Sequence, residues 1–187
     1  MRPTLRTARL TLRPFELTDA PAVQRLAGAY EVALNTLMIP HPYPDGAAEA
    51  WIGMHQDDFD AGRIVQFALD NGELIGAMGL ILKRDQNMAE IGYWIGVPFW
   101  NQGYVSEAAA EILRYGFEEH GLNRIFAGHF ARNAASGRVM QKIGMKYEGT
   151  LRQHEMKWDV YVDVVMYGIL REEWVRLQHP TVVSSAT

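Results

Sequence analysis

The stretch from residue 90 to residue 108 constrains the fold more than any other part of the sequence. A strand-like run at residues 90–95 is followed by a short polar loop containing Gly103, and then by a long helical pattern that starts near Val105. The first N–H groups of a helix have no acceptor within the helix, and the helix dipole adds partial positive charge at that end. A strand, a glycine loop and a helix start in this order therefore predict a site for a phosphate or pyrophosphate.

A second helix start follows at Asn133, after another apolar strand pattern. Asn is a favourable N-cap residue, and the helix that it opens ends near Gly144, with Ser136 in its first turn. Taken alone, Gly103 is equally consistent with a simple tight turn, and Gly96 with a strand bulge. The second segment makes a ligand site the better interpretation.

The remaining periodicity predicts one α/β domain built on a mixed sheet. Asn71-Gly72 is a strong hairpin signal, since both residues accept a positive φ. Strands are predicted at 9–15, 64–70, 73–83, 88–95, 124–131, 145–154 and 160–170, and helices at 47–61, 105–120 and 133–144, with a further helix that opens at Asp19 behind a Thr18 cap. Residues 1–179 are expected to form the single domain, and residues 180–187 a disordered tail.

Composition excludes several classes of function. The 187 residues are 48% hydrophobic and 21% charged, as expected of a globular domain, and include no cysteine, which excludes disulfides, thiolate zinc sites and a cysteine acyl-enzyme. The six histidines lack metal-ligand spacing, so no metal is expected. A net charge of −4 argues against nucleic acid as a partner. Because there is no membrane-length apolar run and no secretory signal, we expect a cytoplasmic protein without a membrane partner.

Five short motifs occur in the order of a known family. They are RLTLRPF at 9–15, EIGYWI at 90–95, WNQGY at 100–104, N-x-x-S-x-R at 133–138 and YVD at 161–163. Together they resemble the GCN5-related N-acetyltransferases (GNAT), and most closely the RimJ/RimL-like branch, which includes enzymes that acetylate the N-termini of ribosomal proteins. The resemblance covers nearly the whole chain. It implies a mixed, mostly antiparallel twisted sheet flanked by helices, with a splayed strand pair that holds acyl-CoA.

The resemblance also assigns the acetyl-CoA site to particular residues. Backbone amides of the 101–106 loop would bind the coenzyme A pyrophosphate, and the preceding strand would pair with the pantetheine amides. Asn133 would be a pantetheine ligand as well as an N-cap, and Arg138 would reach the adenosine phosphates. The expected cofactor-binding residues are Ile95, Gly96, Val97, Asn101, Gln102, Gly103, Tyr104, Val105, Ser106, Asn133, Ser136 and Arg138.

The chain departs from the broad family pattern at positions that bear on catalysis. The tyrosine that often serves as general acid, seven residues after the asparagine, is replaced by Met140, which cannot donate a proton. Ser136 is the expected substitute, because its hydroxyl could stabilise or protonate the departing thiolate; the alternative is a first-turn serine that bonds the backbone. In the loop, Trp100 stands where the family has Gln or Arg, and Val105 where it has Gly or Ala.

A protonated amine cannot act as a nucleophile, so the reaction needs a route for the proton. Glu90 is the main candidate base, because strand alternation puts it on one face with Gly92 and Trp94, beside the expected thioester. The alternative is an exposed strand glutamate without a catalytic role. His129 is either a second candidate base or a core histidine, and Tyr93 is expected to pack.

Two aromatic segments, residues 38–43 and 158–163, are expected to wall the acceptor site, with Asp159 or Asp163 attracting a cationic amine. The leading hypothesis is an acetyl-CoA-dependent N-acetyltransferase in which a primary amine attacks the thioester directly in a ternary complex. The amine would belong to a protein N-terminus or to a small molecule such as a polyamine or antibiotic. The alternative is an acyl-CoA-binding regulatory module without turnover. A P-loop is excluded because Gly-Lys-Ser/Thr is missing, and a homodimer is implied by the resemblance alone.

Overall fold

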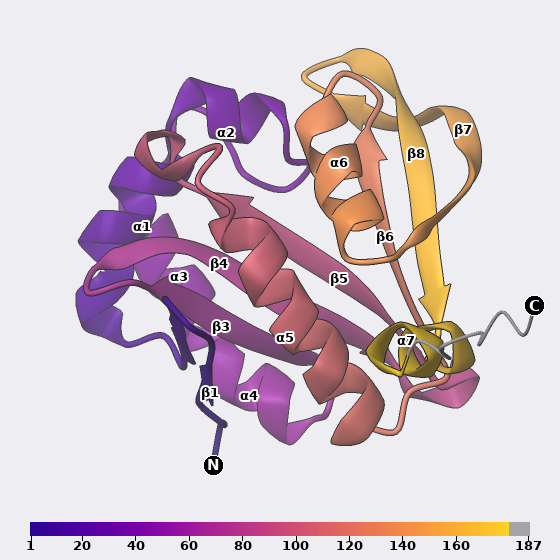
Figure 1. Ribbon diagram of the computed structural model, residues 1–187. Helices are drawn as coiled ribbons and strands as arrows, with labels where there is room; N and C mark the ends of the chain where they lie inside the picture. The colour runs from indigo at the N-terminus through magenta and orange to yellow at the C-terminus, as the bar shows by residue number, and fades with distance from the viewer. Residues whose placement is uncertain (180–187) are drawn as a thin grey trace, which may run out of the picture.

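The computed structural model describes residues 1–179, and its centre is one twisted sheet of eight strands (Figure 1). The spatial order is β1-β2-β3-β4-β5-β6-β8-β7, and every neighbouring pair is antiparallel except β5 and β6. The strands are β1 (Leu5–Arg6), β2 (Thr11–Arg13), β3 (Ile64–Asp70), β4 (Leu74–Lys83), β5 (Met88–Ile95), β6 (Arg124–Phe130), β7 (Lys146–Lys157) and β8 (Val160–Leu170). The predicted mixed, mostly antiparallel sheet flanked by helices is confirmed.

Helices cover both faces of this sheet. On one face α1 (Ala20–Ala27), α2 (Tyr30–Leu34) and α3 (Ala47–Gly53) share a core with Phe15 and Trp94. On the other, α5 (Tyr104–Glu118), α6 (Ala134–Lys142) and α7 (Arg171–Gln178) pack around Phe67 and Met78. In Figure 1, α5 crosses in front of the strands, while α1 and α3 lie behind them. The two apolar cores are therefore separated by the sheet.

The parallel strands β5 and β6 separate part of the way along their length. Their paired register runs from Met88 to Glu90 in β5 and from Arg124 to Phe126 in β6, and ends there. Because the two strands are parallel, α5 and α6 both begin at the same edge of the sheet, beyond the carboxyl ends of the strands. A gap between strands below two helix starts is a common ligand position in α/β proteins.

Three predicted boundaries were wrong for local reasons. The helix predicted at 47–61 is divided at Met54 into α3 and α4 (His55–Asp60). The strand predicted at 9–15 is reduced to β2, because Pro14 has no N–H to continue the ladder. Thr18 does not cap α1: a 3-10 turn, η1 (Leu17–Asp19), comes first, and the Asp19 carboxylate accepts from the Glu16 N–H (2.9 Å).

The elements that sequence periodicity missed are short ones. β1, α2 and α7 span two, five and eight residues, too few for a hydrophobic period to be distinctive. The predicted disordered tail, residues 180–187, lies outside the described residues. Across residues 1–179 the structure has no helix with the length and apolar character that a bilayer crossing requires.

Candidate active site

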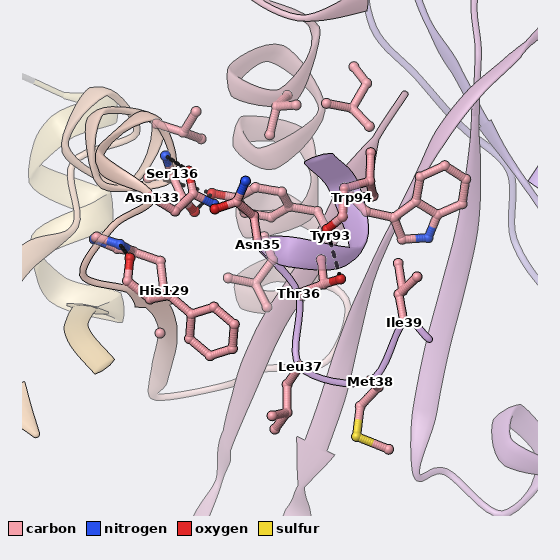
Figure 2. A pocket seen from close by; sticks show the side chains of 18 of the residues that line it. Asn35, Thr36, Leu37, Met38, Ile39, Tyr93, Trp94, His129, Asn133 and Ser136 are labelled. Atoms are coloured by element: carbon pink, nitrogen blue, oxygen red, sulfur yellow. Dashed lines mark hydrogen bonds between the residues drawn. The ribbon is translucent and has the colours of Figure 1, made fainter. Parts of the chain in front are cut away.

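A cavity of about 1140 Å³ occupies the gap between β5 and β6 (Figure 2). Both halves of the chain line it, from helices α1 and α2 to strands β7 and β8. Figure 2 shows His129, Asn133 and Ser136 on one side of the cavity, with Trp94 and Ile39 on the other. Most of the predicted site residues are thus gathered around one space, although they come from distant parts of the sequence.

The loop after β5 presents backbone N–H groups to one end of this cavity. Asn101 has a φ of 60° and Gly103 a φ of 82°, so two left-handed residues turn the chain into α5. Within the described part of the chain, no protein acceptor lies within hydrogen-bond reach of the N–H groups of residues 101–106. Successive N–H groups in such a turn, backed by a helix dipole, form a concavity suited to an anion. This geometry can hold a phosphate or pyrophosphate.

The N-terminal segment fixes this loop from outside. Arg9 Nε pairs with Glu107 Oε2 (2.7 Å), and Arg9 Nη1 donates to the Gln102 carbonyl (3.0 Å). Thr7 Oγ1 donates to Glu107 Oε1 (2.5 Å). Burial alone would raise the pKa of Glu107, but the hydrogen bonds from Thr7 and Arg9 outweigh it and lower that pKa. The loop is held by side chains, which leaves its amides free.

At the start of α6 three polar side chains are linked. Asn133 Oδ1 accepts from the Ser136 N–H (3.2 Å), so the carbonyl caps the helix and only the side-chain NH₂ is left for a ligand. Ser136 is buried, and its Oγ lies 2.6 Å from the Tyr93 hydroxyl. Burial raises the pKa of Tyr93 to about 12, against the opposing effect of the Ser136 hydrogen bond. Tyr93 therefore stays protonated and can donate to Ser136; the expectation that it merely packs was incomplete.

The open edge of β5 faces β6 across the cavity. The Gly96 N–H donates to the Ile75 carbonyl of β4 (2.9 Å), so alternation turns the N–H groups of Tyr93 and Ile95 towards the gap. Gly96 was expected to bind the cofactor, but both of its backbone groups are paired within the protein, since its carbonyl also accepts from the Phe99 N–H (3.0 Å). Packing explains the glycine at this position, because a Cβ on residue 96 would approach the Leu26 side chain to 2.7 Å.

Most, but not all, of the predicted residues line the cavity. Ile95, Asn101, Gly103, Tyr104, Val105, Ser106, Asn133, Ser136 and Arg138 do so, as does Glu90. Gly96, Val97 and Gln102 do not; the Gln102 side chain folds back to donate to the Pro98 carbonyl (2.9 Å). No cluster of His, Asp or Glu suited to a metal occurs in the described residues.

The side chains of the two candidate bases, Glu90 and His129, lie on opposite faces of the sheet. Glu90 lies where the pairing of β5 and β6 ends, on the same face as Trp94, and forms no ion pair within residues 1–179. His129 lies with its Nδ1 2.8 Å from the Phe130 carbonyl, and its buried Nε2 has no partner among the described residues. Its ring stacks on Tyr167 (5.9 Å between centroids). The candidate base Glu90 therefore lies on the α1–α3 side of the sheet, and His129 lies on the α5–α6 side.

Residues 34–39, named here the strap, continue from the end of α2, and Asn35 to Ile39 line the cavity on the Glu90 side. Lys157 Nζ donates to the carbonyls of Leu37 (3.0 Å) and Ile39 (2.6 Å), and Arg132 Nη2 donates to the Leu34 carbonyl (2.5 Å). Burial lowers the pKa of Lys157, and the charge of Arg132 lowers it further. Sequence reasoning missed both cations. They tie the N-terminal half of the fold to the C-terminal half across the cavity.

The predicted acceptor walls were half right. Met38, Ile39, Pro40 and Tyr43 line the cavity, whereas no residue of 158–163 does. The second wall consists of Leu151, His154, Glu155, Val164 and Met166 from β7 and β8. The pairing of β7 with β8 shifts register between Leu151 and Glu155. Within this irregular part of β7, the Gln153 N–H donates to Asp163 Oδ1 (2.7 Å). Asp163 thus holds the backbone of β7 and does not line the cavity.

Comparison with known proteins gives four concordant findings. The family described as Acetyltransferase (GNAT) domain matches residues 9–146. The chain is 35% identical over 173 residues to the uncharacterized N-acetyltransferase YnaD of Bacillus subtilis, covering 90% of this chain and 97% of that protein. It is 25% identical over 139 residues to the ribosomal protein uS5-alanine N-acetyltransferase of Escherichia coli, covering 72% of this chain and 71% of the other. The crystal structure of an acetyltransferase (GNAT family) from Bacillus anthracis superposes with a TM-score of 0.80 at 28% identity, covering 91% of this chain and 99% of that one.

Proposed function

We propose a reaction route and an acceptor class for this chain, which belongs to the GNAT family of acetyltransferases and is an acetyl-CoA-dependent N-acetyltransferase of the RimJ/RimL-like branch. The observation that carries the route is the gap between β5 and β6, with two helix starts at one end and Glu90 at the other. Acetyl-CoA supplies the activated acetyl group. The residues around the gap bind it, orient it and handle the proton.

The amides of residues 101–106 hold the pyrophosphate, with Arg138 at the adenosine end. Their freedom from protein acceptors supports this role. The free edge of β5 at Tyr93 and Ile95 pairs with the pantetheine, and the Asn133 NH₂ donates to it. Backbone N–H groups at this edge also stabilise negative charge on the thioester oxygen during attack. This assignment keeps the cofactor on the edge of the strand, and leaves the Glu90 face for the acceptor.

Attack is direct, in a ternary complex. The chain has no cysteine to form an acyl-enzyme. Glu90, directly or through water, accepts a proton from the amine as the C–N bond forms and the C–S bond breaks. Ser136 donates a hydrogen bond to the departing sulfur. Tyr93 donates to Ser136 Oγ, which frees the serine proton to point at the sulfur and strengthens its donation.

The acceptor is a primary amine, and a protein N-terminus is the class favoured here. The E. coli relative is by its name a ribosomal protein alanine acetyltransferase. Glu90 lines the cavity without an ion pair within residues 1–179, so its carboxylate is available to an amine. A small-molecule amine is the competing acceptor class. A cytoplasmic location and a homodimer remain predictions from the sequence.

Coenzyme A thiol release with a disulfide dye tests this proposal. The substrates are acetyl-CoA with N-terminal peptides, polyamines, amino acids and aminoglycosides, and the cysteine-free protein contributes no thiol of its own. Release with peptides, with acetyl on the α-amine by mass spectrometry, is the expected result. Release only with small amines would replace the acceptor class, and tight acetyl-CoA binding with no release would favour the regulatory module. Ser136→Ala that turns over at the wild-type rate at saturating substrate would remove Ser136 from the route.

A further inference from the structure

Gly92 has no structural reason to be glycine. It lies in the middle of β5 and is exposed, between the buried Ile91 and the half-buried Tyr93. Its φ lies outside the left-handed region, and a Cβ built on it would meet no atom within 4 Å. Glycine in a strand interior weakens the strand and often marks a place where a ligand approaches the backbone. The position is open space that the fold does not use.

The open space has defined borders. Strand alternation puts Glu90 and Trp94 on the same face as Gly92. The cross-strand partner of Gly92 is Gly79, and a Cβ on Gly79 would come within 2.6 Å of the Gln66 Oε1 atom. The Gln66 side chain thus covers Gly79, whereas Gly92 stays uncovered. All five of these residues line the cavity. We name this space the Gly92 slot.

The borders of the Gly92 slot suit a cationic amine. The Glu90 carboxylate and the Gln66 amide oxygen are hydrogen-bond acceptors, and neither side chain has a hydrogen-bond partner within residues 1–179. The Trp94 ring belongs to the apolar core of the α1–α3 face, against which Ile39 of the strap packs. The slot therefore pairs two oxygen acceptors with an apolar end, on the face that also holds the candidate base.

We infer that the Gly92 slot is the subsite for the reacting end of the acceptor, and that it takes a primary amine whose neighbouring carbon bears at most a small substituent. This inference rests on the proposed function. The ammonium group lies beside the Glu90 carboxylate, at the edge of the gap, and the adjacent carbon lies over Gly92 on the side towards Gln66. A side chain at position 92 would occupy the place of that carbon. The same chemistry is offered by peptides that begin with glycine, alanine or serine and by unbranched alkylamines. Gly92 is then a specificity-determining residue.

The test compares Gly92→Ala and Gly92→Val with Gly53→Ala. Gly53 is also exposed, also lacks a positive φ, and also has no atom within 4 Å of a built Cβ, but it lies at the end of α3 outside the cavity. Both alanine variants should unfold at or above the wild-type denaturant midpoint, because alanine removes backbone freedom from the unfolded chain. Acetyl-CoA Kd by calorimetry and kcat/KM for the acceptor are then measured on all four proteins.

Gly92→Ala should lower acceptor kcat/KM about tenfold or more, and Gly92→Val further, with the acetyl-CoA Kd and Gly53→Ala unchanged. Wild type should prefer glycine-, alanine- and serine-initiated peptides and an unbranched diamine over valine- and leucine-initiated peptides by a similar factor. Wild-type rates at Gly92→Ala, or equal use of leucine-initiated peptides, would overturn the inference. A loss of acetyl-CoA binding in the Gly92 variants would also overturn it, because Gly92 would then belong to the cofactor-binding site. A wild type inactive with every amine refutes the proposed function instead.

Discussion

His55 makes the stability of this chain depend on pH in a calculable way. The side chain is 5% exposed, and neither ring nitrogen has a hydrogen-bond partner in the described residues. Trp51 and Phe15 pack edge-on against it, with ring centroids 4.4 and 5.3 Å away. Burial lowers the pKa of His55 from 6.5 to about 4; the charge of Arg2 adds to this, and Asp58 opposes it.

The sign follows from which state binds the proton more tightly. Between pH 6.5 and about 4 the unfolded chain protonates His55 while the folded chain does not, so stability falls as the pH falls. Above pH 6.5 His55 is neutral in both states, and no stability is lost through it. The whole shift corresponds to about 3 kcal/mol, of which about 2 kcal/mol is lost by pH 5.

The assay is urea unfolding at pH 7.5 and pH 5.0 for wild type and His55→Leu. Other groups titrate in this range, among them His120, whose pKa burial also lowers. Their contribution is common to both proteins and cancels in the difference. Wild type should lose about 2 kcal/mol more than His55→Leu between the two pH values. Equal losses would show that the buried imidazole is not held neutral by this pocket, and would refute the reasoning.

Three further predictions concern the cavity. Tyr93→Phe should lower kcat about fivefold with an unchanged acetyl-CoA Kd, because Ser136 loses one hydrogen bond of about 1 kcal/mol; an additive effect with Ser136→Ala in steady-state kinetics would contradict the link between them. Glu90→Gln should lower kcat at neutral pH by about 10² or more while a calorimetric acetyl-CoA titration stays the same, and a near-normal rate would leave water or His129 as the proton acceptor. Lys157→Met should raise the acceptor KM about tenfold by freeing the strap carbonyls of Leu37 and Ile39; Lys146→Met, which breaks a surface pair with Glu173, is the matched control and should change neither constant.

Local signals predicted the sheet well. The Asn71-Gly72 turn joins β3 to β4 with Gly72 at a φ of 110°, as the dipeptide indicates. The limits predicted for the strand at residues 88–95 coincide with β5. Asn133 caps α6, and its spacing to Ser136 is the one a cap requires. In each case the residue acts on its own backbone, so a single sequence contains the information.

Features that depend on contacts distant in sequence were missed. The link between Tyr93 and Ser136 spans 43 residues, and that between Lys157 and Leu37 spans 120. Nothing in either local sequence indicates these partners. The acceptor wall at 158–163 was misplaced because a register shift in β7 cannot be read from a period of two. The sequence placed Gly92 on the same face of the strand as Glu90 and Trp94. Only the structure shows that the space next to Gly92 is open.

The crystal structure of the chain with acetyl-CoA would test the central claim most directly. We predict the pyrophosphate on the amides of residues 101–106, the pantetheine along the β5 edge at Tyr93 and Ile95, and the sulfur within hydrogen-bond reach of Ser136. The acetyl group would then face Glu90 and the Gly92 slot. A cofactor bound outside the gap between β5 and β6, or one whose sulfur is remote from Ser136, would contradict the account.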